Sequence, residues 1–396
     1  MVNLYSLNEM VSTLSSAEFL PIFQKQTYLM NQKSFIFQPT LFIFLVFLLI
    51  ITSCDSTSPL TPTVEEEEVE IPTPPVTTTP TSNSTIAFYN VENLFDTVDD
   101  PQNDGDNEFL PTAPKAWTMD RYEHKLNNIG LVMKGMGYPI IMGVSEVENK
   151  KVLEDLAKIE SLKDYSYQVV HEESPDHRGI DVALLYQPEF FQVLETATYE
   201  VTIDDPQIQN YTTREILMVK GMVGNETLYV FVNHWPSRSG GEAKSEFRRI
   251  TVAEVLKEKI EELQTMDSAA QVIIMGDFND EPTNKSVQQV LGAKISKETT
   301  TTPNVLYNCT TSLTAQGAGS YNYQGNWQMI DQIITTGNLS STDNAIQVTN
   351  FQVYKDDMLL FTHPDYGPTP DRTYGGDNYY GGFSDHLAIY VELVKK

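Results

Sequence analysis

Short runs of apolar and β-branched residues recur along the chain from about residue 85 to its C-terminal end. Each run has five to eight residues, and most are followed within two residues by Gly, Pro, Asn, Asp or Glu. This pattern is typical of buried β-strands. We therefore predict strands over residues 85–89, 139–144, 181–186, 216–220, 227–233, 271–275, 330–335 and 386–393.

Three longer segments carry apolar residues at three- and four-residue spacing, which is the period of an amphipathic helix. They are residues 121–136, 150–159 and 244–263. Strands and helices that alternate along a chain predict an α/β fold in which helices cover packed sheets. Because no internal repeat or second linker divides this part of the sequence, we assign residues 86–396 to one domain.

A different pattern precedes this domain. Residues 41–51 form an uninterrupted apolar run that is too short for a bilayer of about 30 Å but has the length of a signal-peptide core. The run ends in Ile-Thr-Ser-Cys at Cys54, which resembles a bacterial lipobox. We expect residues 30–53 to be a lipoprotein signal peptide, with Cys54 lipidated, and residues 1–29 to be a mis-assigned start; an isolated buried or membrane helix is the alternative.

Residues 54–85 are rich in Ser, Thr and Pro and contain an acidic block at residues 65–70. Such a segment cannot bury a core and is expected to be a semi-extended tether. An acidic block so close to a lipid anchor resembles the surface-export signals of some Gram-negative lipoproteins. We therefore expect attachment at the outer membrane or cell surface, with the periplasmic face as the alternative.

The chain is strongly acidic, with 54 Asp and Glu against 26 Lys and Arg and a net charge of −28. Six of these negative charges fall in the tether, which leaves −22 on the domain. Because the sequence has no concentration of basic residues, the release of counterions cannot give strong nonspecific affinity for nucleic acid. A phosphodiester substrate would need divalent cations between its phosphates and the protein carboxylates. The two cysteines, Cys54 and Cys309, offer no disulfide framework.

Polar residues stand where the first two predicted strands end. Asn90 closes the first strand, and Glu146 and Glu148 follow the second. A carboxylate at the end of an apolar strand is costly unless a positive group meets it. The structural alternatives are a turn at Asn90 and the first turn of a helix at the glutamates.

Two more strands are flanked by side chains suited to phosphate. Arg178 and Asp181 precede the strand at 181–186, where the arginine could hold a phosphate oxygen and the aspartate could position it. A plain surface ion pair is the alternative. Asn233 and His234 close a later strand with Arg238 nearby, and histidine is suited to proton transfer near neutral pH. A lone core histidine is the alternative.

The clearest chemistry lies toward the C-terminal end. Asp277 and Asn279 follow a buried strand and present two polar groups side by side, although a tight turn would use the same residues. Asp331 opens one strand, and Asp385 and His386 open the last. An aspartate that is distant in sequence can hold a histidine ring in a fixed orientation through a hydrogen bond, as acid–base catalysis requires.

In chain order, the motifs NVENLF, SEVEN, RGIDVALLY, NHWPSR, GDFN, IDQI and SDH closely resemble the endonuclease/exonuclease/phosphatase superfamily, which has the fold of pancreatic deoxyribonuclease and exonuclease III. The resemblance covers nearly all of residues 86–396. It implies a four-layered α/β sandwich, in which two packed mixed β-sheets are flanked by helices. It also implies an active site at the C-terminal ends of the central strands and Mg²⁺-dependent hydrolysis of phosphoesters.

The resemblance assigns the metal ligands to Asn90, Glu146 and Asp385. Their oxygen atoms suit Mg²⁺, with Mn²⁺ or Ca²⁺ as alternatives. From the residues themselves, we expect Arg178, Asp181, Asn233 and Arg238 to contact the substrate. Nothing in the sequence indicates an obligate protein partner.

The remaining residues are similar to the family's catalytic groups. His234 resembles the histidine that contacts the scissile phosphate. Asp277 and Asn279 resemble the pair that orients water and steadies the phosphate, and His386, oriented by Asp331, resembles the general base. The match leaves open whether Asp277 or His386 removes the proton from water.

The predicted function is that of an exported, lipid-anchored, Mg²⁺-dependent phosphodiesterase, a nuclease acting on DNA or RNA. Abasic-site specificity is not expected, because the tyrosine of that branch is absent before the strand at 181–186. Tyrosines of the Gly-rich segment 361–383 are suited to stacking on bases or sugars, with local packing as the alternative. The alternative functions are a phosphatase, a sphingomyelinase-like lipid phosphodiesterase and a non-catalytic surface binding protein.

Overall fold

The structure is a computed structural model that describes residues 84–101, 103–295 and 301–395. The predicted start, the signal peptide, the lipidation site at Cys54 and nearly all of the tether lie outside the described residues. Among the described residues, no helix combines the length and the apolar character that crossing a membrane requires.

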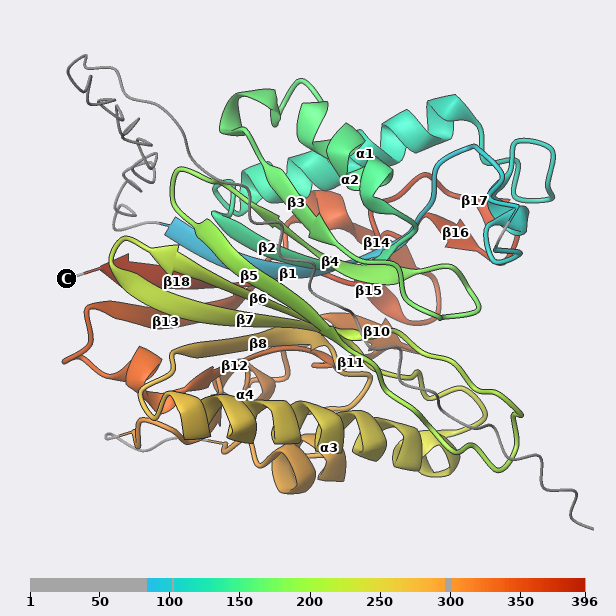
Figure 1. The fold of residues 1–396 in the computed structure, drawn as a ribbon. Helices are drawn as coiled ribbons and strands as arrows, with labels where there is room; N and C mark the ends of the chain where they lie inside the picture. The colour runs from blue at the N-terminus through green and yellow to red at the C-terminus, as the bar shows by residue number, and fades with distance from the viewer. Residues whose placement is uncertain (1–83, 102, 296–300, 396) are drawn as a thin grey trace, which may run out of the picture. The chain divides into compact units, whose positions relative to one another are not determined.

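Two six-stranded mixed sheets form the centre of the domain (Figure 1). In the first sheet the strand order is β13 (Ile346–Val353), β18 (Ile389–Lys395), β1 (Ser84–Leu94), β2 (Ile141–Val147), β4 (Asp181–Tyr186) and β3 (Gln168–His171). The order in the second sheet is β5 (Gln192–Tyr199), β6 (Ile216–Val223), β7 (Glu226–His234), β8 (Val272–Asp277), β12 (Asp331–Thr336) and β9 (Leu306–Asn308). The pairs β1–β2 and β7–β8 are parallel, and the other pairs are antiparallel.

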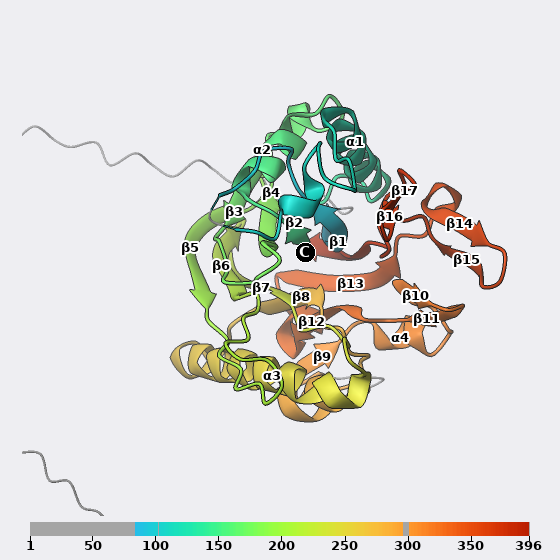
Figure 2. The same ribbon diagram turned by 90° about the vertical axis from the view of Figure 1, so that its right-hand side faces the viewer.

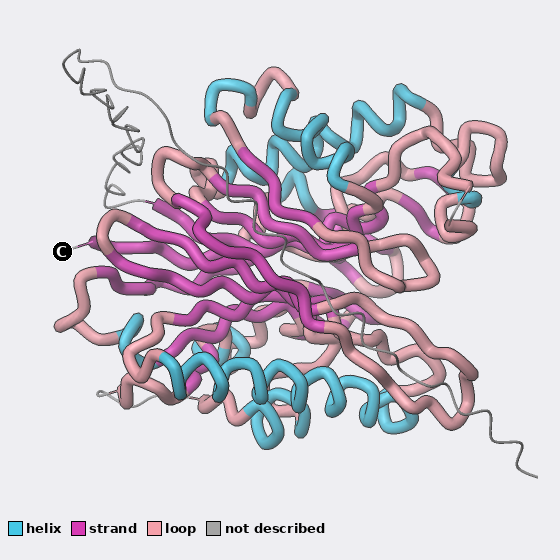
Figure 3. Tube along the Cα trace, in the orientation of Figure 1, coloured by secondary structure: helices cyan, strands magenta, loops and turns pink. Residues whose placement is uncertain are grey.

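Helices cover the outer face of each sheet, as Figures 2 and 3 show. The first sheet carries α1 (Met119–Gly135) and α2 (Lys150–Lys158), and the second carries α3 (Glu242–Met266) and the π-helix η3 (Ser286–Leu291). Short helices complete the described part: η1 (Asn107–Phe109), η2 (Lys163–Tyr165), α4 (Thr311–Thr314), η4 (Gly337–Ser340) and η5 (Asp357–Leu359). The predicted four-layered α/β sandwich is confirmed.

Three hydrophobic clusters hold these layers together. The central one lies between the sheets and includes Phe88 and Ile86 from one sheet and Val230 and Met275 from the other. The two outer clusters join each sheet to its own helices. Successive strand residues point to opposite faces of a sheet. The other sheet covers one face of each central strand and helices cover the opposite face, so residues on both faces are buried. This explains the continuous apolar sequence of these strands.

Three small hairpins extend from the sheets on the right-hand side of Figure 2. They are β10–β11 (Tyr321–Tyr323 and Asn326–Gln328), β14–β15 (Leu360–His363 and Gly367–Pro370) and β16–β17 (Tyr374–Gly375 and Asn378–Tyr379). The sequence did not predict them as strands, because their Tyr-, Gly- and Asn-rich segments carry no apolar period. The three hairpins line one pocket beside the polar ends of the sheets.

Candidate active site

The apolar rows that face the inter-sheet core end in polar side chains. In β1 the row is Ile86, Phe88 and then Asn90, and in β8 the core-facing Met275 is followed two residues later by Asp277. His234 continues the core-facing row of β7 in the same way, and Asp331 begins that of β12. Because side chains alternate between the two faces of a strand, the polar residue at the end of each core-facing row also faces the inter-sheet core. Each of these strands therefore places one polar group at the same edge of the core.

Glu146 reaches this edge by a different route. The register between β2 and β4 shifts between Ser145 and Val147, so Glu146 is the extra residue of a bulge. Its backbone is left-handed, with φ of 62°, which is uncommon for glutamate. Val144 and Val147 both lie in the core against the helices, three residues apart. The bulge allows this spacing and re-aims the glutamate between them.

Asn90 and Asp277 join the two sheets at the centre of the site. Asn90 Nδ2 donates to Asp277 Oδ2 at 3.1 Å, and the backbone N–H of Asn279 donates to Asp277 Oδ1 at 2.9 Å. Burial, together with the neighbouring Asp331 carboxylate, raises the pKa of Asp277 to about 7. This carboxyl group is therefore poised to exchange a proton near neutral pH.

His386 is held by Asp331. Its Nδ1 lies 2.7 Å from Asp331 Oδ2, and its Nε2 lies 3.8 Å from Asp277 Oδ2. Burial alone would lower the pKa of the imidazole, but the Asp331 carboxylate, with Asp277 and Asp385, outweighs burial and holds that pKa well above its ordinary value. The predicted histidine–aspartate pair is thus present, with Nε2 directed at the centre of the site.

His234 faces the same centre from β7. Its Nε2 lies 3.6 Å from Asp277 Oδ2 and 3.9 Å from Glu146 Oε1. Burial, followed by the charges of Arg214 and Arg178, lowers the pKa of His234 well below its ordinary value. Its buried Nδ1 has no hydrogen-bond partner among the described residues. The two histidines therefore differ in charge although they approach the same carboxylate.

Arg178 supplies the positive group that Glu146 requires. Its Nη2 lies 3.4 Å from Glu146 Oε2 and donates to Asn93 Oδ1 at 2.8 Å. Burial would raise the pKa of Glu146, but the nearby positive charges of Arg178, His386 and Arg214 together outweigh burial and lower it. Arg178 is half-exposed, with 39% of its side chain accessible, so its guanidinium can also meet a substrate phosphate.

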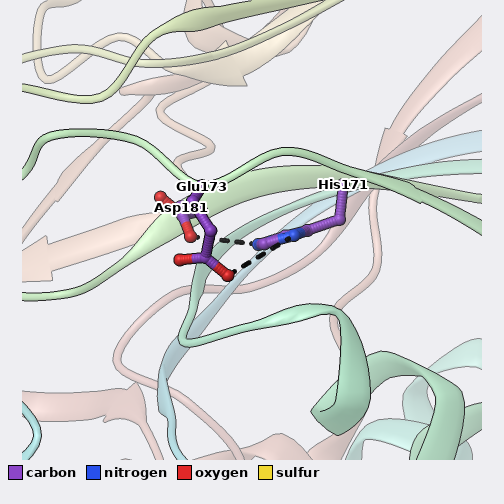
Figure 4. Close-up of side chains that lie close together, drawn as sticks. All are labelled: His171, Glu173 and Asp181. Carbon is purple, nitrogen blue, oxygen red and sulfur yellow. Dashed lines mark hydrogen bonds and ion pairs between the residues drawn. The ribbon is translucent and has the colours of Figure 1, made fainter. Parts of the chain in front are cut away.

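Asp181 lies in a separate network, shown in Figure 4. Its Oδ2 is 3.0 Å from His171 Nε2, and its Oδ1 accepts from the backbone N–H of Ser174 at 2.8 Å. Glu173 Oε1 lies 4.0 Å from the other ring nitrogen, Nδ1 of His171. These contacts occupy Asp181, and the expected positioning of Arg178 comes instead from Glu146 and Asn93.

Asn233 and Arg238 also have structural partners. Asn233 is fully buried, and its Oδ1 accepts from Trp235 Nε1 at 3.2 Å. Arg238 Nε donates to the backbone carbonyl of Asn279 at 2.7 Å, and Asn279 Nδ2 donates to the carbonyl of Trp235 at 3.0 Å. These contacts fix the loop after β8, where Asn279 is left-handed with φ of 49°.

Asp385 is paired with an arginine that the sequence analysis missed. Arg372 Nη2 donates to Asp385 Oδ2 at 2.9 Å, and its Nε lies 3.4 Å from Glu92 Oε1. The expected role of Asp385 as a metal ligand stays a prediction. Arg372 lies in the Gly-rich segment PDRTYGG. The sequence signal that could have identified it is its position just before the tyrosines of the segment 361–383.

Arg214 is a second missed residue. It is buried, and its Nε and Nη2 donate to the backbone carbonyls of His234 and Trp235 at 3.1 and 2.8 Å. Its Nη1 donates to Asp176 Oδ2 at 2.8 Å, and Asp176 Oδ1 accepts from the backbone N–H of Arg178. Arg214 therefore ties together the segments that carry His234 and Arg178.

Comparison with protein families assigns residues 85–395 to the model described as the Endonuclease/Exonuclease/phosphatase family. The chain belongs to this family. Members of the endonuclease/exonuclease/phosphatase family are phosphoric ester hydrolases that use divalent metals. A search of the curated proteins finds no match.

Several solved structures of the endonuclease/exonuclease/phosphatase fold are similar to this chain. The human Nocturnin catalytic domain with bound sulfate is 17% identical, with a TM-score of 0.48, over 79% of this chain and 94% of its own. D. rerio TDP2 complexed with a single-strand DNA product is 14% identical, with a TM-score of 0.48, over 79% of this chain and 99% of its own. The Bacteroides thetaiotaomicron mannosyl-6-phosphatase Bt3783 is 19% identical, with a TM-score of 0.47, over 78% of this chain and 99% of its own.

The residues present fit the divalent ion that the endonuclease/exonuclease/phosphatase family uses. Asn90 and Glu146 offer amide and carboxylate oxygens, which are the ligands of hard cations. Asp277, Asp331 and His386 form a compact buried group, and Oδ1 of Asp331 has no hydrogen-bond partner among the described residues. This concentration of buried negative charge would be relieved by a cation.

Proposed function

We propose that the chain is a Mg²⁺-dependent phosphodiesterase that hydrolyses DNA or RNA. The observation that supports this chemistry is the approach of His234 and His386 to one oxygen of Asp277, with Glu146 facing His234. Metal-assisted attack by water requires acid–base groups whose pKa values differ and a carboxylate that can bind the metal. This site contains both.

Each residue has a distinct role in this proposal. Asp277, with a pKa raised to about 7, accepts the proton of the attacking water. His386, kept protonated by Asp331, donates a hydrogen bond from Nε2 to the phosphate. The unlike charge states of the two groups support this division over the reverse one.

The groups on the opposite side bind the phosphate. Arg178 meets a non-bridging oxygen, and His234 lies beside the leaving group. Glu146 and Asn90 would hold the ion, which when bound neutralises the charge that develops on the phosphate oxygens. Asn90 and Asn279 keep Asp277 oriented through their hydrogen bonds to its two oxygens.

A panel of substrates tests the function. We expect the full chain with millimolar Mg²⁺ to hydrolyse DNA or RNA with little sequence preference. Because few cations line the site, activity should fall only shallowly with salt. Methyl p-nitrophenyl phosphate measures the phosphodiesterase chemistry without a nucleic acid. Hydrolysis of sphingomyelin or of sugar phosphates, with none of DNA or RNA, would reverse the assignment in favour of the lipid phosphodiesterase or the phosphatase.

We also propose that the enzyme is exported and anchored by lipid at Cys54, at the outer membrane or cell surface. The apolar run at 41–51 and the lipobox-like sequence support this proposal. A lipoprotein anchor with two or more acyl chains is stable, whereas one chain would be marginal.

Mass spectrometry of the native N-terminus tests the anchor. We expect a mature chain that begins at an acylated Cys54, and a Cys54→Ser variant that no longer partitions with membranes. Cys309→Ser is the matched control and should leave partitioning unchanged. An unmodified residue upstream of position 54, or membrane association of the Cys54→Ser variant, would contradict the proposal.

A further inference from the structure

An aromatic pocket of about 820 Å³ opens beside the catalytic centre. All three hairpins contribute to it, and its lining includes rings from segments more than 50 residues apart. These rings are Tyr321, Tyr323, Phe361, Tyr366, Tyr379 and Tyr380. Its volume is that of a site for a small ligand rather than of a groove for a long polymer.

The rings in this pocket are unusually accessible. Among the described residues, the large aromatic side chains that are exposed are Tyr323 (55%), Phe361 (50%), Tyr366 (43%) and Tyr380 (61%), and all of them line this one pocket. Exposed aromatic surface is costly in water and marks binding sites when it is gathered in one place.

The pocket is continuous with the catalytic residues. The Tyr321 ring packs against the His386 ring with centroids 4.9 Å apart, and an isolated backbone bridge joins the same two residues. Asp385, the neighbour of His386, lines the pocket together with its partner Arg372. A phosphate at the catalytic centre would therefore place its attached group at the mouth of the pocket.

The charge of the lining limits what the pocket can hold. Among the described residues of the lining, Arg372 is the one Lys or Arg, and its guanidinium is engaged by Glu92 and Asp385. Asp371 and Asp385 add negative charge to the wall. The pocket is therefore unsuited to a row of phosphates and suited to an uncharged, flat group.

Polar lining groups are largely used within the protein. Asn322 Oδ1 accepts from the backbone N–H of Gly325 at 2.9 Å, and Thr369 Oγ1 donates to the carbonyl of Phe361 at 3.3 Å. Sugar hydroxyls need several convergent polar partners, whereas a nucleobase needs ring faces and few hydrogen bonds.

We propose that this pocket binds one or two unpaired nucleobases next to the scissile phosphate, so that the enzyme prefers single-stranded nucleic acid to duplex. A base within a duplex is stacked and paired, and it cannot enter a cage of rings without being extruded. The inference rests on the proposed nuclease function and adds the form of its substrate. Affinity then comes from stacking, with little contribution from charge.

The test compares a single-stranded oligonucleotide with its blunt duplex, using the full chain and Mg²⁺. We expect kcat/KM to be at least about tenfold higher for the single strand. The double substitution Tyr323→Leu and Tyr380→Leu should raise KM for the single strand about tenfold or more, because two stacking faces are lost. Tyr323→Phe with Tyr380→Phe is the matched control; it keeps both rings and should stay within about twofold of wild type.

The outcomes separate this inference from the proposed function. Equal cleavage of duplex and single strand, or an unchanged KM in the leucine variant, would overturn the base pocket while leaving the nuclease in place. Hydrolysis of methyl p-nitrophenyl phosphate without cleavage of any nucleic acid would instead overturn the nuclease function. A sugar phosphate whose hydrolysis depends on these tyrosines would assign the pocket to a sugar.

Discussion

Replacing Glu146 with Ala is expected to reduce phosphodiester hydrolysis about a thousandfold or more at millimolar Mg²⁺. The substitution removes the anionic side chain that the bulge in β2 directs into the site, and it leaves Arg178 without its carboxylate partner. A thousandfold loss corresponds to about 4 kcal/mol of transition-state stabilisation, which is within the range that a bound metal supplies. Steady-state rates with increasing Mg²⁺ measure the effect.

Glu146→Gln separates charge from packing. Glutamine keeps an oxygen that can accept from the Asn93 N–H but lacks the negative charge, so we expect activity as low as in the alanine variant with less loss of thermal stability. Glu148→Gln is the matched control two residues away. Glu148 accepts from the backbone N–H of Asp96 at 2.6 Å, outside the centre, and its substitution should leave hydrolysis near wild type. Turnover that persists in EDTA would refute a metal-dependent reaction.

His386 and Asp331 are expected to act as one unit. Asp331 Oδ2 is 2.7 Å from His386 Nδ1, so the carboxylate orients the ring and stabilises its protonated form. His386→Ala and Asp331→Ala should each lower kcat about a thousandfold, and the double variant should lose little more. Losses that multiply fully would show that the two residues act independently.

The pH profile gives a second measurement of this unit. In the wild type, the Asp331 charge holds the pKa of His386 well above its ordinary value despite burial, so the histidine stays protonated until the pH rises through that raised pKa. Asp331→Asn removes the charge, and the pKa falls. The alkaline limb of the kcat profile, where the protonated form is lost, should therefore move to lower pH. An unmoved limb would exclude His386 as its origin.

The sequence predicted the central strands because those strands are buried on both faces. The edge strands of both sheets escaped prediction: β3, β5, β9 and β13. In β5 the residues are half-buried or exposed, so polar and apolar side chains mix without a clean period. Edge strands are recognised by their pairing in the folded state, and that pairing leaves little trace in the chain itself.

The candidate site was predictable where a side chain simply continues a core-facing row, as Asn90, His234 and Asp277 do. The alternation of side chains along a strand then determines which face of the sheet the polar side chain is on. The end of the apolar run shows where along the strand it lies. Glu146 was noted as a carboxylate at a strand end, and the resemblance gave it a metal-binding role, but its direction depends on a bulge that alternation cannot show. Arg214 and Arg372 were missed because their partners, among them Asp176 and Glu92, lie far away in sequence.

The hydrogen bond between Asn90 and Asp277 crosses from one sheet to the other. Asn90, Glu146 and His386 reach the site from the first-sheet side, and His234, Asp277 and Asp331 come from the second sheet. Neither half of the sandwich contains a working set of groups. The catalytic centre therefore forms only when the two sheets pack against each other. Because folding of the domain is cooperative, a partly folded form with an incomplete site and residual hydrolase activity is not expected to accumulate.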